Sequence, residues 1–322
     1  MNIHKTVVVL LALLLAGIAM VPMVSANEDL RSSEKSQELS QLPIGIAPIQ
    51  PPGNGVSDDE IREMIKTTIK AIKSSNLDKK IKDQNIKLLS NYLINQSPIN
   101  QEDLEKTMIS MRPDCLDKIS LLPTPKWAGF IHNDMALIAG QKMAVTCSLS
   151  PSEITLLENN AAVPDTWGSA NHYKLYGATA NAESYANIAR GYYLSGDTVK
   201  GAVNMSYALH FMTDMSMPFH WGPSALPAHE QYEIYLSNHW TSGDNDEYYQ
   251  NVVSGNNYYY TVTDVSDSAD NLIAITNWYQ SYLENQINNN PNWQADSTVR
   301  SDTRDSLLYG ARYNMGLIDY VK

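Results

Sequence analysis

The sequence predicts an all-α fold. Apolar residues recur every three to four positions in several long segments, among them Val199–Met215 and Ser297–Tyr320. Capping residues and prolines stand at the ends of such segments, as at Ser57 and Pro218. No internal repeat and no glycine-rich loop of the Rossmann type occurs in the sequence. These observations together favour a bundle of helices over a nucleotide-binding sheet.

The first 26 residues have the features of a secretory signal. Lys5 supplies the positive charge, Val7–Met20 is the apolar core, and Val24–Ala26 is a small-residue cleavage site. An uncleaved membrane anchor is the alternative, because the apolar run approaches spanning length when it is extended to Val24. In either case the sequence predicts export, to a secreted or extracytoplasmic location.

Residues 27–126 are expected to form a linker followed by a small helical segment. Asn27–Val56 is polar and then rich in proline and glycine, which is typical of a linker. Three helices are expected next, the first capped by Ser57 and the others at Lys80–Ile94 and Asn100–Met111. The apolar residues of the first helix fall on one stripe: Ile61, Met64, Ile65, Ile69 and Ile72. The segment shows no recognisable chemistry, and we interpret it as a prosegment or an accessory module.

From Trp127 onward the composition shifts towards tyrosine, tryptophan, alanine and methionine. Gly243–Val262 is polar and contains three consecutive tyrosines, which either pack in the interior or form an aromatic lip. The helices expected in this part are one opened by Pro227 and four further segments: Asn181–Ser195, Val199–Met215, Asp267–Ile287 and Ser297–Tyr320.

Charge and cysteine content limit the function. The formal net charge is −12. Residues 127–322 hold 8 Lys and Arg against 20 Asp and Glu, whereas residues 27–126 are nearly neutral. Such an acidic region is a poor nucleic-acid binder, and a phosphate site in it would need bound cations. Cys115 and Cys147, the only cysteines, could pair in an oxidising compartment or remain isolated thiols.

Two residues of metal-binding type begin the most informative stretch, Ala208–Tyr235. His210 and Asp214 lie four residues apart, so their side chains share one face of a helix. Pro218 is expected to end that helix, and His220 follows directly, where it can fold back over the same site. One pair of this kind is more often an ordinary surface contact than a metal site.

The same spacing occurs a second time shortly afterwards. His229 and Glu233 lie four residues apart in the helix that Pro227 is expected to open. Imidazole and carboxylate ligands together suit zinc. Two such pairs with an additional histidine between them therefore predict a zinc site.

These residues also form a family motif. The run H-F-M-T-D-M-S-M-P-F-H at residues 210–220, followed by H-E-Q-Y-E at 229–233, resembles the core signature of the bacterial zinc-dependent phospholipases C. The fungal single-strand zinc nucleases share that fold and much of the signature. W-A-G-F-I-H at 127–132 is similar to the first element of the family. The resemblance implies a compact multi-helix catalytic domain over residues 127–322.

The family has three zinc ions, and its ligands can be carried over residue by residue. One zinc would be held by Asp165, His172, His210 and Asp214. Asp214 would bridge to a second zinc, completed by His132 and Trp127. The third would be held by His220, His229 and Glu233. The resemblance also implies that Asp165 acts as general base, and Asn171 and Tyr173 flank His172 and could orient it.

The resemblance implies an enzyme that hydrolyses phospholipid or another phosphodiester. We expect it to be a monomer that contacts a membrane surface transiently and has no nucleic-acid partner. The final H-x-x-Y-E is the phospholipase form, whereas the nucleases end in aspartate. The W-x-x-x-x-H spacing is closer to the nucleases, and Thr166 replaces the tyrosine of the choline-binding form. A non-catalytic di-iron bundle is disfavoured because no Glu-x-x-His motif occurs.

Trp127 raises a question of processing. In the family the α-amine of this tryptophan binds zinc, yet removal of the signal at Ala26 leaves residues 27–126 in front of it. An amide nitrogen within a chain has no lone pair to offer. We therefore expect a zymogen that is completed by cleavage after Lys126, in an extended proline-rich run. A disulfide between Cys115 and Cys147 would keep the cut segment attached.

Overall fold

The computed structural model describes residues 42–45, 47, 56–95, 98–118, 129–167, 169–223, 226–241 and 248–322. The chain divides into two compact units, Met1–Ser40 and Gln41–Lys322, and the described residues all belong to the second. The expected signal, most of the linker, Lys126 and Trp127 therefore lie outside the described residues. No helix within the described ranges is long and apolar enough to cross a membrane.

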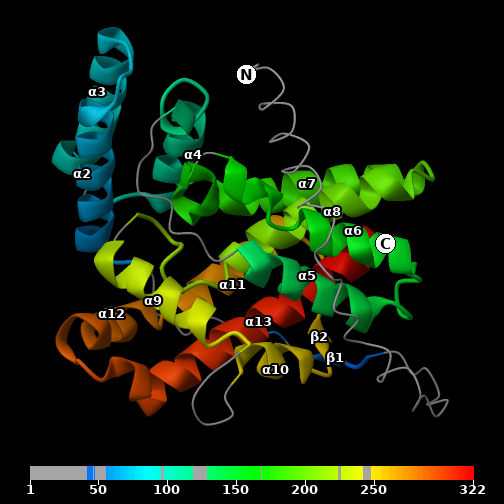
Figure 1. Cartoon of the computed structure of the whole chain (residues 1–322). Coiled ribbons are helices and arrows are strands. Elements are labelled where there is room, and N and C mark those ends of the chain that lie inside the picture. Colours follow the sequence, from blue (N-terminus) through cyan, green and yellow to red (C-terminus); the bar gives the residue numbers. More distant parts are fainter. Residues whose placement is uncertain are drawn as a thin grey trace, which may run out of the picture. The chain divides into compact units, whose positions relative to one another are not determined.

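The described residues are mostly helical, which confirms the all-α prediction. The only regular strands among these residues are two short parallel ones, β1 (Ile44–Gly45) and β2 (Tyr259–Tyr260). The helices, shown in Figure 1, are α2 (Asp58–Ser74), α3 (Lys79–Asn95), α4 (Gln101–Met111), α5 (Gly129–Met143), α6 (Pro151–Asn160), α7 (Ala178–Leu194), α8 (Thr198–Asp214), α9 (Leu226–Asn238), α10 (Tyr249–Ser254), α11 (Val265–Asn277), α12 (Gln280–Asn289) and α13 (Ser297–Val321).

The first three helices form where the sequence predicts them. Ser57 caps α2 through a complete capping box with Glu60, and Asn100 caps α4 by accepting from the Asp103 amide. The expected isoleucine and methionine stripe of α2 is buried. It packs into one continuous hydrophobic cluster with residues of α7, α8 and α13. Helices α2–α4 thus share the core of the rest of the unit.

Helix α8 occupies the centre of the unit, and α5, α6, α7 and α13 all pack against it. Gly196 has a φ of +84°, a left-handed conformation that lets the chain reverse between α7 and α8. Asp197 then caps α8 by accepting from the Lys200 amide. Because α8 is surrounded on most sides, the residues at its C-terminal end are deeply buried. The C-terminal end of α8 is therefore shielded from solvent.

The structure corrects one expected helix. Asp267–Ile287 forms two helices, α11 and α12, that are separated at Trp278 and Tyr279. The break allows α11 to face the main hydrophobic cluster while Leu283 of α12 packs into a second cluster. Trp278, at the break, is 51% exposed. Packing against two separate cores has overridden a continuous helical pattern.

Two other open questions are resolved by burial. Tyr259 and Tyr260 are buried at 4% and 2% exposure, so this tyrosine pair packs in the interior and does not form a lip. Cys115 and Cys147 are free, buried thiols rather than a disulfide. Burial raises the pKa of the Cys115 thiol to about 11 and that of Cys147 to about 12. Both thiols therefore stay protonated and unreactive at neutral pH.

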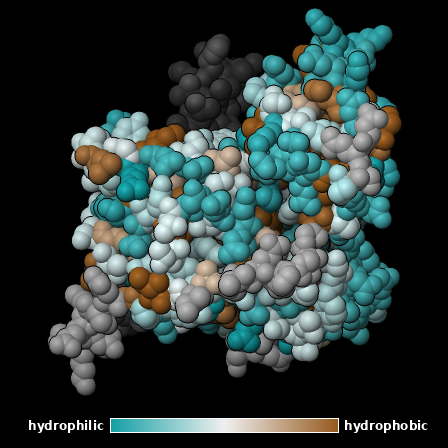
Figure 2. Space-filling model, turned by 180° about the vertical axis from the view of Figure 1, so that it is seen from behind, coloured by the Kyte–Doolittle hydropathy of each residue, from teal (hydrophilic) through white to brown (hydrophobic). Residues whose placement is uncertain are grey.

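On the face seen in Figure 2, hydrophobic side chains are scattered singly among hydrophilic ones. The most exposed large hydrophobic residues of the described chain, Leu194 at 83% and Ile94 at 77%, belong to different helices, α7 and α3. Isolated apolar side chains of this kind are ordinary on a soluble surface. Exposure therefore points to no particular function for them.

Candidate metal centre

The end of α8 carries the central carboxylate of the site. His210 and Asp214 lie one turn apart on α8, and the side chains are 0% and 1% exposed. His210 Nδ1 donates to the Ala161 carbonyl at 2.8 Å, because a carbonyl oxygen can only accept. In the neutral ring the lone pair is therefore on Nε2, which lies 3.2 Å from Asp214 Oδ2. The local structure thus fixes the tautomer that a metal requires.

Asp214 contacts four imidazoles through its two oxygens. Oδ1 lies 3.6 Å from His132 Nε2 and 3.3 Å from His220 Nδ1. Oδ2 lies 2.9 Å from His172 Nδ1 and 3.2 Å from His210 Nε2. The two oxygens face different groups of histidines, which is the geometry that a bridging carboxylate needs.

The histidines reach this carboxylate from four different elements. His132 lies on α5, His172 ends a 3₁₀ turn at Ser169–His172, and His220 lies in the turn after α8. His132 and His210 have stacked rings with centroids 4.0 Å apart. Pro218 follows the end of α8, as the sequence predicts, and the chain then returns His220 towards Asp214.

The structure brings these residues into three groups that could hold a metal ion, all within the described part of the chain. In each group the ligand atoms lie within 4.8 Å of one another. The first cluster is Asp165, His172 and His210; the second is His132, His210 and Asp214; the third is His220, His229 and Glu233. The sequence proposed eight of these positions, and the structure gathers all eight. Trp127, the ninth proposed ligand, lies outside the described residues.

The third cluster forms around one carboxylate oxygen. Glu233 Oε1 lies 2.9 Å from His229 Nε2, one turn earlier on α9, and 3.5 Å from His220 Nε2. Phe219 stacks on the His229 ring at 5.5 Å. Because His220 also contacts Asp214, this cluster adjoins the other two. The three clusters therefore make one contiguous centre.

Buried atoms without partners test whether a cation fits this centre. Asp165 Oδ2 and Glu233 Oε2 are buried carboxylate oxygens with no hydrogen-bond donor among the described residues. Leaving such an acceptor unsatisfied in the interior is costly. A metal ion would satisfy both oxygens and would separate imidazole nitrogens such as His172 Nδ1 and His210 Nε2, now 3.0 Å apart. Five imidazoles with three carboxylates form a donor set that suits zinc.

Electrostatics in the centre favour ionised carboxylates. Burial opposes ionisation of Asp214, but the imidazoles of His210 and His172 outweigh it and hold its pKa well below the usual range. Glu233 behaves in the same way, with His229 and His220 lowering its pKa against burial. Burial and the neighbouring His210 lower the pKa of His132, which keeps that imidazole neutral. Asp214 raises the pKa of His210 against burial, and Asp214 with Glu233 raises that of His220 to about 9, so these two imidazoles would release a proton when a metal binds.

Asp165 differs from the other two carboxylates. Its side chain is 20% exposed, against 1% for Asp214 and 3% for Glu233. Its Oδ1 lies 3.8 Å from His210 Nε2. Burial nevertheless raises the pKa of Asp165. Asp165 is therefore the carboxylate of the centre that lies nearest to solvent.

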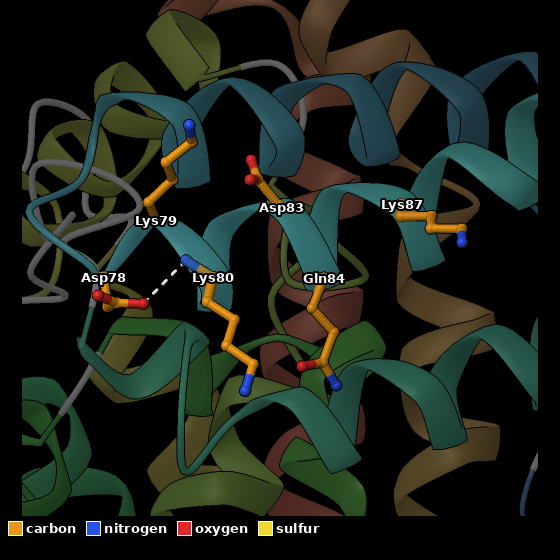
Figure 3. A pocket seen from close by; sticks show the side chains of 6 residues that line it. All are labelled: Asp78, Lys79, Lys80, Asp83, Gln84 and Lys87. Atoms are coloured by element: carbon orange, nitrogen blue, oxygen red, sulfur yellow. Dashed lines mark hydrogen bonds between the residues drawn. The ribbon is translucent and has the colours of Figure 1, made fainter.

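Other candidates lie outside the centre. His239 donates from Nδ1 to the Tyr235 carbonyl at 2.8 Å, and its ring is tilted against the Tyr235 ring with the centroids 4.4 Å apart. The hollow along α3 in Figure 3 is lined by Lys79, Lys80 and Lys87 with polar neighbours, none of which belongs to the three clusters. These three lysines lie on α3, and none of them is a candidate metal ligand.

Sequence reasoning missed part of the surroundings of the centre. Tyr173 was expected to flank His172 and to orient it, but its ring also lies 5.5 Å from His220 and 6.2 Å from His229. Arg112, in a segment with no recognised chemistry, hydrogen-bonds the side chain of Asn171. The adjacency of Tyr173 to His172 was a local signal for the first. No local signal exists for Arg112, since 59 positions separate it from Asn171.

Comparisons with known proteins add no family to this picture. No family model matches the chain, and no curated protein matches it. The family resemblance therefore depends on the motifs, and the activity that it implies is treated below as a proposal.

Proposed function

We propose that the protein is an exported zinc-dependent phosphodiester hydrolase, specifically a phospholipase C that cleaves phospholipid to diacylglycerol and a phosphorylated headgroup. The observation that carries this proposal is the contiguous centre in which Asp214 contacts four imidazoles. The residues that meet there are the ones that the family motif supplies, in an all-α unit of the expected kind.

The residues of the centre divide into binding and proton-transfer roles. Zinc, when bound, would lower the pKa of water and offset the charge of a phosphodiester. Asp214 and Glu233, both ionised and nearly inaccessible, would hold metal throughout. Asp165 is more exposed and its pKa is raised, so its carboxylate would accept the proton of an attacking water. This assigns Asp165 as the general base.

The small number of basic residues in the proposed catalytic region supports a lipid substrate rather than a polynucleotide. Residues 127–322 contain only 8 Lys and Arg, and several are already engaged. Lys174 pairs with Asp270 at 2.6 Å, Lys200 with Asp197 at 2.6 Å, and Lys322 with Glu153 at 2.9 Å. A polynucleotide needs a row of available cations, because phosphate contacts dominate its affinity.

A single-strand nuclease is the second candidate, and one observation favours it. Trp167, two residues after Asp165, forms an aromatic group with Tyr185, Tyr207 and Phe211 at centroid distances of 5.3 to 6.1 Å. Phe211 in turn lies 6.0 Å from His172. Nucleic-acid bases stack on such rings, although the same rings would also contact the apolar or cationic part of a headgroup.

One comparison of rates separates the two functions. Purified protein would be assayed on phosphatidylcholine vesicles and on single-stranded DNA at matched zinc and salt, with Asp214→Asn as the inactive control. We expect diacylglycerol release well above DNA cleavage, and neither activity in the control. Faster DNA cleavage would reverse the assignment, and no hydrolysis of either substrate by a zinc-loaded protein would refute both.

A further inference from the structure

The segment that carries His172 is held from outside by the N-terminal helices. Residues 171–176 run through two short 3₁₀ turns and have no long helix of their own. Thr68 on α2 shares a 2.6 Å hydrogen bond with the Tyr176 hydroxyl, and both residues are buried. Glu105 on α4 lies 3.6 Å from Lys174. The position of this segment therefore depends on residues that precede the proposed catalytic domain.

Arg112, directly after α4, makes the most extensive of these contacts. Its Nη2 donates to Asn171 Oδ1. Its Nη1 donates to the Tyr176 carbonyl at 3.1 Å and lies 3.4 Å from Asn181 Oδ1. Its Nε donates to Asp117 at 3.2 Å. The guanidinium thus spans both ends of the 171–176 segment with a single rigid plane.

The chemistry of these contacts favours positioning over simple attraction. The Arg112 side chain is only 15% exposed, so its charge is largely removed from water. Asp117, the charged partner of Arg112, belongs to the same N-terminal part of the chain as Arg112. The atoms of residues 171–176 that Arg112 contacts are neutral oxygens. A hydrogen bond from the ionised guanidinium to a neutral oxygen is stronger than one between neutral groups, and its strength depends on good geometry. A planar fork of donors meets that demand, and a lysine ammonium does not.

The same segment is linked to a second metal-binding stretch. The Lys174 amide donates to the His220 carbonyl at 2.9 Å, and the Leu175 amide donates to the Trp221 carbonyl at 2.9 Å. A shift of the segment would therefore move His172 directly and His220 through these two bonds. Both histidines contact Asp214.

We propose that Arg112 is a positioning residue for the metal centre, which it serves from the N-terminal helices by fixing Asn171 and thereby His172. The proposal rests on the proposed metal centre and extends it to residues 56–118. On this proposal, helices α2–α4 contribute to metal binding in the folded enzyme. Their removal would loosen metal rather than only uncover the site.

Zinc affinity measures this role without any substrate. Affinities of the wild type, Arg112→Ala and Arg112→Lys would be determined by competition with a chromophoric chelator. Loss of a residue that orients a ligand typically weakens metal binding about 10- to 100-fold, and we expect that loss for at least one zinc in Arg112→Ala. Arg112→Lys should recover little of it, because an ammonium cannot reach the same acceptors together. Thermal unfolding of the metal-free proteins would show that each variant folds.

A matched arginine in the same unit provides the control. Arg62 on α2 donates to the Leu93 carbonyl at 2.8 Å, a contact between α2 and α3, so Arg62→Ala should keep wild-type zinc affinity. A double-mutant cycle with Asn171→Ala isolates the link to His172. The double variant should lose less affinity than the sum of the two single losses, because both changes break the same Arg112–Asn171 hydrogen bond.

Three results would overturn the proposal. The first is a folded Arg112→Ala protein with wild-type affinity for every zinc. The second is additive losses in the cycle, which would mean that Arg112 acts on stability alone. If Arg112→Ala does not fold, Asn171→Ala decides, and wild-type zinc affinity in that variant is the third. A wild-type protein that binds no zinc would instead refute the metal centre and this proposal with it.

Discussion

Replacing Asp214 by asparagine is expected to remove two zinc ions at once and to abolish activity. The change keeps the shape of the side chain but removes the negative charge and one acceptor oxygen. Both oxygens of Asp214 are used, Oδ1 by His132 and His220 and Oδ2 by His172 and His210. The second cluster therefore loses its own carboxylate, and the first loses the carboxylate that contacts its His172 and His210, whereas the third keeps Glu233.

The magnitude follows from the burial and charge of Asp214. Two unit charges about 4 Å apart attract by roughly 4 kcal/mol at an effective dielectric constant of about 20, and a dication doubles that to about 8 kcal/mol. Desolvation of the carboxylate offsets part of this energy. Loss of a residue that only orients a ligand weakens metal binding by up to about 100-fold, or about 2.7 kcal/mol. Loss of the bridging charge should exceed that, so two of three zincs should be absent from purified Asp214→Asn.

The assay is zinc content per chain after gel filtration, with activity measured on the same sample. Asp134→Asn is the matched control on α5. Its carboxylate accepts from Trp240 at 2.7 Å and from Gln250 at 3.0 Å, outside the three clusters. It should retain the zinc content of the wild type. Full zinc content and ordinary turnover in Asp214→Asn would refute the bridging role.

Three further predictions concern other parts of the molecule. Glu233→Gln should lose only the zinc of the third cluster, and loss of more than one zinc per chain would contradict separate occupancy of the clusters. Cleavage after Lys126 should raise the zinc content from two firmly held ions to three, and helices α2–α4 should remain bound through their shared core. N-terminal sequencing, zinc analysis and gel filtration of the cut protein check this. A chain that begins at Asn27 and already holds three zinc ions would exclude the zymogen. Burial, Asp305 and Asp296 raise the pKa of Asp302 from 3.8 to about 6, so the stability it provides is present at low pH and is lost as pH rises through about 6. Asp302→Asn should therefore raise the melting temperature of the metal-free protein at pH 7.5 and leave it unchanged near pH 3, and equal shifts at both values would rule out this titration.

Local patterns in the sequence were enough to predict most of the helices and the two histidine–carboxylate pairs of the candidate metal centre. The Ser57–Glu60 capping box and the histidine–carboxylate pairs of α8 and α9 depend on residues within one helical turn of each other. Contacts of this kind form wherever the helix forms, whatever the surrounding fold. Helix α6 was overlooked although Ser150 and Glu153 form a capping box of the same type.

Features that depend on distant contacts were not predictable in this way. The break between α11 and α12 follows from packing against two different clusters, which a helical pattern does not record. Arg112 acts on a residue 59 positions away. His132 and Asp214 come together only because α5 packs against α8. The family motif indicated this last contact, whereas periodicity and composition alone did not.

Zinc anomalous scattering tests the central claim most directly. Crystals of the purified protein would be measured just above and just below the zinc absorption edge. The account predicts difference peaks that vanish below the edge, next to Asp165 and His172, next to His132 and Asp214, and next to His229 and Glu233. Peaks at none of these places, or peaks that persist below the zinc edge, would contradict a zinc centre built from these residues.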